Sequence, residues 1–254
     1  LLKNACKSYS DIRQNESYQF SRNYALSIYP LDAVYTFIPK NGCSTLRFST
    51  AVANGFLSDL KDVNWIHLNN PTFVASQRAI SCAKYTFVVL RCPFRRLASC
   101  LLNKFVTGEL NLNNEEGKKI DSTFSFFVNF VTSQKREMMN EHWRHQSDFL
   151  HYESYDDYFS LEKFSVAIKK LKDKGFEVID TRSAIKHDKS HMQKKYGNYS
   201  STPISELMKM RSEGYVPADS ALYTEETYSI IEDFYKEDFE LYKQEIGANN
   251  ILKL

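Results

Sequence analysis

Glycine and proline are scarce in this chain, and no long apolar run interrupts it. The 254 residues include only 8 glycines and 6 prolines, which excludes collagen-like and low-complexity proteins. No stretch of about 18 apolar residues occurs, so we expect no membrane span in this chain. The 5 cysteines are odd in number and form no Cys-x-x-Cys pair, so we predict reduced thiols rather than a zinc site or a disulfide framework.

A secretory leader is also missing from the first ten residues, which are polar and include Lys3 and Lys7. Reduced thiols and the missing leader favour a cytoplasmic protein, and the many Lys, Asn and Ile residues favour a bacterial one. The chain does not begin with Met, so the alternative is a protein of the Golgi lumen whose N-terminal anchor has been removed.

What remains is an ordinary globular composition with an uneven distribution of charge. Hydrophobic residues make up 43% and charged residues 25%, enough for one large domain with its own core. Residues 1–108 hold 13 Lys and Arg against 5 Asp and Glu, although the whole chain has a net charge of only +2. Because no dense basic run occurs, this surplus predicts an anionic small ligand and no nucleic acid partner.

Strands and helices are predicted to alternate along the chain. Patterns of buried strands occur at 33–38, 63–67, 85–90 and 176–179. Helices are predicted over 94–106, 161–174 and 224–246. Two more are predicted to begin at a cap: one runs from Ser44 or Thr45 to Gly55, and the other from Asp121 or Ser122 through 124–131. Loops are predicted at 109–121 and 182–203. This order predicts an α/β fold, a single domain in which helices flank a P-loop-like parallel sheet.

The first candidate anion site is the turn that follows the strand at 33–38. Gly42 allows the chain to turn tightly, so that the backbone N–H groups from Asn41 to Thr45 can converge at the start of a helix. Such a group of donors, with the positive end of the helix dipole, binds phosphate. Lys40 adds a charge that can stabilise a departing phosphate oxygen.

The same turn does not match three better-known phosphate loops. Lys40 precedes Gly42, which excludes a Walker A motif, and one glycine does not make a Rossmann fingerprint. The spacing from Cys43 to the next arginine does not fit a phosphate loop with a cysteine nucleophile, so we expect this thiol to pack. The hydroxyls of Ser44 and Thr45 add two further hydrogen-bond donors to the backbone N–H groups of this turn.

The second candidate anion site follows the strand at 85–90. Arg91 lies just past the carboxyl end of this strand, where ligands bind in open α/β sheets, and Ser99 lies on the helix that follows. A guanidinium fork and a hydroxyl are suited to a phosphate group. Arg95 and Arg96 are better interpreted as surface cations or as partners of acidic residues.

These two segments resemble known motifs. PKNGCST followed by RCPFRRLAS resembles the 5′-phosphosulfate loop and the 3′-phosphate motif of sulfotransferases that use 3′-phosphoadenosine 5′-phosphosulfate (PAPS). More narrowly, the chain is similar to the carbohydrate sulfotransferase family that includes the chondroitin 4-O and HNK-1 enzymes. The pair His142-Trp143 and the segment FYKEDFELYK support this resemblance, which spans residues 33–243. Cys92 departs from the family, which usually has an acidic residue there.

The resemblance implies a sulfotransferase fold, PAPS as the donor, no metal, and a carbohydrate hydroxyl as the acceptor. Lys40 would contact the bridging or leaving oxygen of the phosphosulfate. The backbone from Asn41 to Thr45 would hold the 5′-phosphate, and Arg91 and Ser99 would hold the 3′-phosphate.

Transfer to a hydroxyl also needs a base near neutral pH, and a histidine suits that role. His67 is the first candidate, because it ends the predicted strand at 63–67 and related sulfotransferases often carry their base at this point. His142, which belongs to the His-Trp resemblance, is the second candidate for the base and is alternatively a residue that binds the acceptor.

The resemblance also divides the chain into an N-terminal extension (1–30), a PAPS-binding half (33–108), acceptor-side loops and helices (109–220) and a C-terminal helix (224–246). A basic stretch late in the chain either covers the nucleotide or is solvated charge; it holds Lys189, Ser190, Lys194 and Lys195. His187 and His191 lack the Glu that would complete a zinc motif.

Two other functions stay open at this point. A P-loop-type nucleotide kinase would depend on ATP and Mg²⁺ and would need an acidic metal ligand after the strand at 85–90, where none is found. A non-catalytic protein that binds a nucleotide or glycan would keep the fold without the chemistry, and Cys92 is the one sequence feature in its favour.

Overall fold

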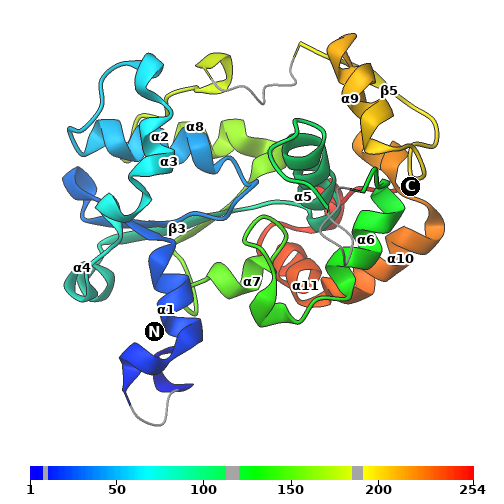
Figure 1. Cartoon of the computed structure of the whole chain (residues 1–254). Coiled ribbons are helices and arrows are strands. Elements are labelled where there is room, and N and C mark those ends of the chain that lie inside the picture. Colours follow the sequence, from blue (N-terminus) through cyan, green and yellow to red (C-terminus); the bar gives the residue numbers. More distant parts are fainter. Residues whose placement is uncertain (8–10, 113–119, 185–190) are drawn as a thin grey trace. The chain divides into compact units, whose positions relative to one another are not determined.

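The structure of this protein is a computed structural model that describes residues 1–7, 11–112, 120–184 and 191–254 (Figure 1). Within it the chain forms two compact units. Unit 1 comprises Leu1–Arg91, His145–Ile185 and Gln244–Ile246, and unit 2 comprises Cys92–Arg144, Lys186–Lys243 and Gly247–Leu254. No helix in the described ranges is long and apolar enough to cross a lipid bilayer.

Unit 1 is built around a four-stranded sheet in the order β1-β2-β3-β4. The strands are β1 (Ala25–Ile28), β2 (Ala33–Thr36), β3 (Tyr85–Leu90) and β4 (Asp157–Ser160). β1 pairs antiparallel with β2, whereas β2 with β3 and β3 with β4 pair in parallel. Every residue of β1, β2 and β3 is buried, as expected for a sheet covered on both faces. The predicted α/β class, with helices flanking a largely parallel sheet, is confirmed.

Helices cover both faces of this sheet. In Figure 1, α2 and α8 lie on one side of it and α1 and α7 on the other. The helices of unit 1 are α1 (Glu16–Asn23), α2 (Cys43–Ala53), α3 (Trp65–Leu68), α4 (Gln77–Cys82), α7 (Gln146–Phe149) and α8 (Phe164–Asp173). In the core, the Tyr35 and Phe87 rings of neighbouring strands stack with centroids 4.9 Å apart, and apolar residues of α2 and α8 pack in the same cluster.

Unit 2 is mainly helical. Its elements are α5 (Pro93–Cys100), a π-helical turn (Leu101–Phe105), α6 (Phe124–Thr132), β5 (Gln193–Lys195), α9 (Ile204–Ser212), β6 (Tyr215–Pro217), α10 (Glu225–Phe234) and α11 (Lys236–Glu245), whose last two residues belong to unit 1. β5 and β6 pair in parallel, and α6 packs on α10. The predicted start of the last helix is confirmed, because Thr224 caps α10 and forms a capping box with Thr227.

The strand predicted at 63–67 is wrong, and a helix takes its place. Asp59 caps the 3₁₀ turn Leu60–Asp62, and the chain then coils directly into α3. Val63 and Ile66 are both buried, and a spacing of three residues brings two side chains to one face of a helix but to opposite faces of a strand. The period of the apolar residues therefore favoured the helix.

The strand predicted at 176–179 is also wrong. The N–H of Ile179 donates to the hydroxyl of Ser49 in α2 at 2.9 Å, and the N–H of Phe176 donates to the carbonyl of Leu171. Phe176 is buried in the core cluster. The apolar run thus packs against the helices without pairing with a strand, and burial alone explains its composition.

Three predicted helix boundaries need correction. α2 begins at Cys43 with Gly42 as its N-cap, so neither Ser44 nor Thr45 caps it. Thr123 caps α6 through its hydroxyl, in place of Asp121 or Ser122. The single helix predicted at 224–246 is interrupted at Tyr235, which separates α10 from α11. Of the loop predicted at 109–121, residues 113–119 lie outside the described residues.

Candidate active site

The loop between β2 and α2 in unit 1 turns through two left-handed residues. Lys40 has a φ of 74° and Gly42 has a φ of 77°. The left-handed conformation costs a non-glycine residue about 1–2 kcal/mol, so the surrounding contacts must hold Lys40 in place. A Cβ at Gly42 would lie 2.9 Å from Cδ1 of Leu161, the residue that follows β4. Both the backbone conformation and this close approach therefore require glycine at position 42.

The turn leaves a group of backbone donors at the start of α2. Among the described residues, no side chain caps this helix, whose N-cap is Gly42. α2 is 11 residues long, so its N-terminus carries the positive end of a helix dipole. The backbone N–H groups of a first helical turn, together with the dipole, form a site suited to a phosphate group.

Arg91 directly contacts this loop. Its Nη1 donates to the carbonyl of Lys40 at 2.8 Å. The amide of the Asn41 side chain donates to the carbonyl of Val89 in β3 at 2.8 Å. β2 and β3 are neighbouring parallel strands, so the loops at their carboxyl ends lie at the same edge of the sheet. The two predicted anion-binding loops are thus joined to each other.

Gln146, at the start of α7, forms hydrogen bonds with both loops. Its Oε1 accepts from the side chain of Asn41 at 2.6 Å and from the backbone N–H of Arg91 at 3.0 Å. Its Nε2 donates to the carbonyl of Arg91 at 2.9 Å. Gln146 was not predicted from the sequence, because its role depends on contacts with loops that are distant along the chain.

The side chains at the start of α2 differ in their contacts and burial. The Thr45 hydroxyl lies 2.9 Å from the hydroxyl of Thr181, and one of the two protons in this pair stays available for another acceptor. Cys43 and Ser44 are half-buried. No described carboxylate forms an ion pair with Arg91. Its positive charge is therefore not offset by a carboxylate at the edge of the sheet where the dipole of α2 is also positive.

The candidate bases lie in different units. His67 belongs to α3 of unit 1, and its side chain is exposed. His142 belongs to unit 2, where its Nδ1 lies 2.7 Å from Oδ1 of Asn140. Ser99, proposed for the 3′-phosphate, lies in α5 of unit 2 and is buried. The roles assigned to these three residues stay predictions.

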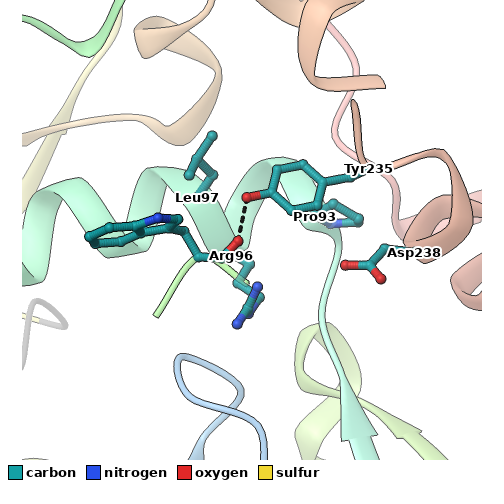
Figure 2. Close-up of a pocket in the computed structure, with 6 residues that line it drawn as sticks. Pro93, Arg96, Leu97, Tyr235 and Asp238 are labelled. Carbon is teal, nitrogen blue, oxygen red and sulfur yellow. Dashed lines mark hydrogen bonds between the residues drawn. The ribbon is translucent and has the colours of Figure 1, made fainter. Parts of the chain in front are cut away.

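Figure 2 shows a small hollow in unit 2, lined by Pro93, Arg96, Leu97, Trp143, Tyr235 and Asp238. The Arg96 guanidinium is buried and donates to the carbonyls of Arg144 at 2.6 Å and Glu141 at 3.1 Å. The Tyr235 hydroxyl donates to the carbonyl of Trp143, and burial raises the pKa of this phenol well above its usual value. These contacts give Arg96 a structural role toward backbone carbonyls.

The late basic stretch is only partly within the described residues. Lys189, Ser190 and His187 lie outside them, whereas Lys194 and Lys195 are exposed on β5. The ammonium of Lys195 lies 4.0 Å from the ring centroid of Tyr215. Across the described ranges, no group of three or more His, Cys, Asp or Glu side chains is arranged to hold a metal ion.

Ligands of open α/β proteins bind at the carboxyl ends of parallel strands, and the groups at this edge are chemically suited to a phosphorylated ligand. Comparison with known families specifies the class further. The model of the sulfotransferase family matches residues 31–244, which include both loops. The chain therefore belongs to the sulfotransferase family, whose members are transferases that move sulfuryl groups. No curated protein and no solved structure matches the chain significantly.

Proposed function

We propose that this protein transfers a sulfuryl group from PAPS to a hydroxyl of a carbohydrate. The observation that carries the proposal is the hydrogen bond from Arg91 to the carbonyl of Lys40. A nucleotide phosphorylated at both the 3′ and 5′ positions needs two anion sites at one edge of the sheet, and this contact supports such an arrangement. The carbohydrate acceptor is proposed from the resemblance to the chondroitin 4-O and HNK-1 enzymes.

The residues of this edge fit a doubly phosphorylated donor. The N–H groups of residues 42–45 bind the 5′-phosphate, assisted by the hydroxyls of Ser44 and Thr45. Arg91 binds the 3′-phosphate. Ser99 of unit 2, assigned to the same phosphate from the sequence, stays a prediction. Lys40 neutralises the charge on the oxygen that bridges phosphorus and sulfur.

The transfer is an in-line displacement. The acceptor oxygen forms a bond to sulfur as the bond between sulfur and the bridging oxygen breaks, which yields a sulfate ester and adenosine 3′,5′-bisphosphate. His67, or alternatively His142, takes the proton of the acceptor hydroxyl. Lys40 and the amides of α2 stabilise the phosphate oxygen that departs, and holding both reactants at one edge removes much of the entropic cost.

The proposal is tested by calorimetric titration with adenosine 3′,5′-bisphosphate. We expect the wild type to bind it without metal, and Arg91→Ala and Lys40→Ala each to lose about tenfold in affinity through the loss of a charge-assisted contact. Arg78→Ala is the matched control, because Arg78 is an exposed arginine of α4 in the same unit. The proposal fails if the wild type does not bind, or if it binds ATP with Mg²⁺ in preference.

A further inference from the structure

Arg47 is a buried cation without a carboxylate partner. It lies in the second turn of α2 and is only 7% exposed. Its Nη2 donates to the carbonyl of Ile66, and its guanidinium carbon lies 5.0 Å from the ring centroid of Phe37. Within the part of the chain that the structure describes, no carboxylate forms an ion pair with it. Burying a charge without a carboxylate partner lowers the stability of the folded protein, so we looked for a function that this arginine serves.

The two partners of Arg47 belong to different parts of the candidate site. Phe37 begins the segment that leads from β2 into the loop of Lys40. Ile66 lies in α3 directly before His67, the first candidate for the base. The guanidinium stacks on an aromatic ring and donates to a carbonyl at the same time, which the compact ammonium of lysine does less well.

Arg47 also lies one turn after Cys43, the first residue of α2. Helical side chains tilt toward the N-terminus of their helix, so Arg47 leans toward Cys43, four residues earlier. The fully buried hydroxyl of Tyr35 has no hydrogen-bond partner among the described residues. Burial and the Cys43 thiol raise the pKa of this phenol, whereas the charge of Arg47 lowers it. The positive charge therefore adds to the potential at the amides of residues 42–45.

We propose that Arg47 is a positioning residue of the transfer site, which holds the His67 segment against the donor loop and whose charge is balanced by the bound nucleotide. This inference rests on the proposed function. It assigns to one side chain both a mechanical link, through Ile66 and Phe37, and an electrostatic contribution to donor binding. This role explains why no carboxylate pairs with Arg47 in the unliganded protein, because the nucleotide supplies the negative charge.

Two variants separate the link from the charge. Arg47→Met removes both, and Arg47→Lys keeps the charge but loses the planar fork. The probe is adenosine 3′,5′-bisphosphate, with its affinity measured by calorimetry and the protection of backbone amides measured by hydrogen exchange. In the wild type we expect binding to protect residues 41–46 and also residues 64–69, because Arg47 couples the loop to α3.

We expect Arg47→Met to lose about tenfold in affinity, as the loss of one nearby charge implies, and to lose the protection of residues 64–69. Arg47→Lys should keep the affinity and the protection of residues 41–46 while losing that of residues 64–69. The melting temperature of unliganded Arg47→Met should change little, because the loss of the hydrogen bond to Ile66 and of the contact with Phe37 is offset by the removal of a buried charge that has no carboxylate partner. Arg78→Met, an exposed control, should leave all three measurements unchanged.

The failures of the two proposals are distinguishable. A wild type that does not bind the bisphosphate overturns the proposed function and this inference together. Normal binding by the wild type and by Arg47→Met, or retained protection of residues 64–69 in both variants, overturns this inference alone. A lower melting temperature of Arg47→Met with unchanged affinity would leave Arg47 a purely structural role. If Arg47→Met does not fold, Arg47→Lys tests the inference: loss of the protection of residues 64–69 supports it, and retained protection overturns it.

Discussion

The side-chain amide of Asn41 donates to Oε1 of Gln146 across a distance of 2.6 Å, although the two residues are 105 positions apart in the chain. Both side chains are buried, and Gln146 also bonds the N–H and the carbonyl of Arg91. A single glutamine thus fixes the loops after two neighbouring strands. Its removal should affect folding and donor binding together.

We expect Gln146→Ala to lower the free energy of unfolding by about 2–3 kcal/mol, because it leaves buried polar groups of Asn41 and Arg91 without partners. Affinity for adenosine 3′,5′-bisphosphate should fall in the same variant. Urea denaturation and calorimetry measure the two effects. Gln14→Ala, at an exposed position, is the control and should change neither. Unaltered stability of Gln146→Ala would show that its hydrogen bonds contribute little.

Gly42→Ala should be destabilised by more than Gly55→Ala. Both glycines have positive φ, 77° and 82°, so both substitutions carry a similar cost in the backbone. Only at Gly42 would the new Cβ meet a neighbour, Cδ1 of Leu161 at 2.9 Å, whereas nothing lies within 4 Å at Gly55. Thermal denaturation measures the difference, and Leu161→Ala should recover part of the loss from Gly42→Ala. Equal effects of the two glycine substitutions would contradict this account.

Stability should fall as pH drops from about 6.5 to about 4, because His151 is buried in its neutral form. It is 1% exposed, its Nδ1 lies 2.9 Å from the hydroxyl of Ser21, and burial, with a smaller effect of Arg22, lowers its pKa to about 4. In this pH range the unfolded chain binds a proton that the folded protein does not, so unfolding becomes more favourable as pH falls.

The contribution of His151 to this loss reaches about 3.4 kcal/mol at most, because its pKa is about 6.5 in the unfolded chain and about 4 in the folded protein. Urea denaturation between pH 4 and pH 7 measures it. A His151→Gln variant should show a flatter dependence over this range, while His191→Gln, at an exposed position, should resemble the wild type. A wild-type slope in His151→Gln would assign the pH dependence to other groups.

Adenosine 3′,5′-bisphosphate should protect Cys43 from alkylation. The thiol is half-buried and follows Gly42 at the start of α2, among the amides proposed to bind the 5′-phosphate. Iodoacetamide labelling followed by mass spectrometry measures the rate at each cysteine. Cys82 is exposed in unit 1 and serves as the internal control, whose rate should not change. Equal rates at Cys43 with and without the nucleotide would place the binding site elsewhere.

The sequence by itself determined the parts that depend on local pattern. The apolar runs at 33–38 and 85–90 predicted the two central strands, because a fully buried parallel strand must be apolar along its length. Gly42 predicted the tight turn, and its positive φ confirms the reason. The same reasoning failed at 63–67 and 176–179, where short apolar runs are equally compatible with other buried structure.

Only the tertiary structure decided how the two loops meet. The contact between Arg91 and Lys40 exists because β2 and β3 are adjacent in the sheet and parallel, a register that no local signal specifies. Gln146 and Arg47 were not predicted for a related reason. A polar side chain gains its role from the groups that surround it once it is buried, and these groups come from distant parts of the chain.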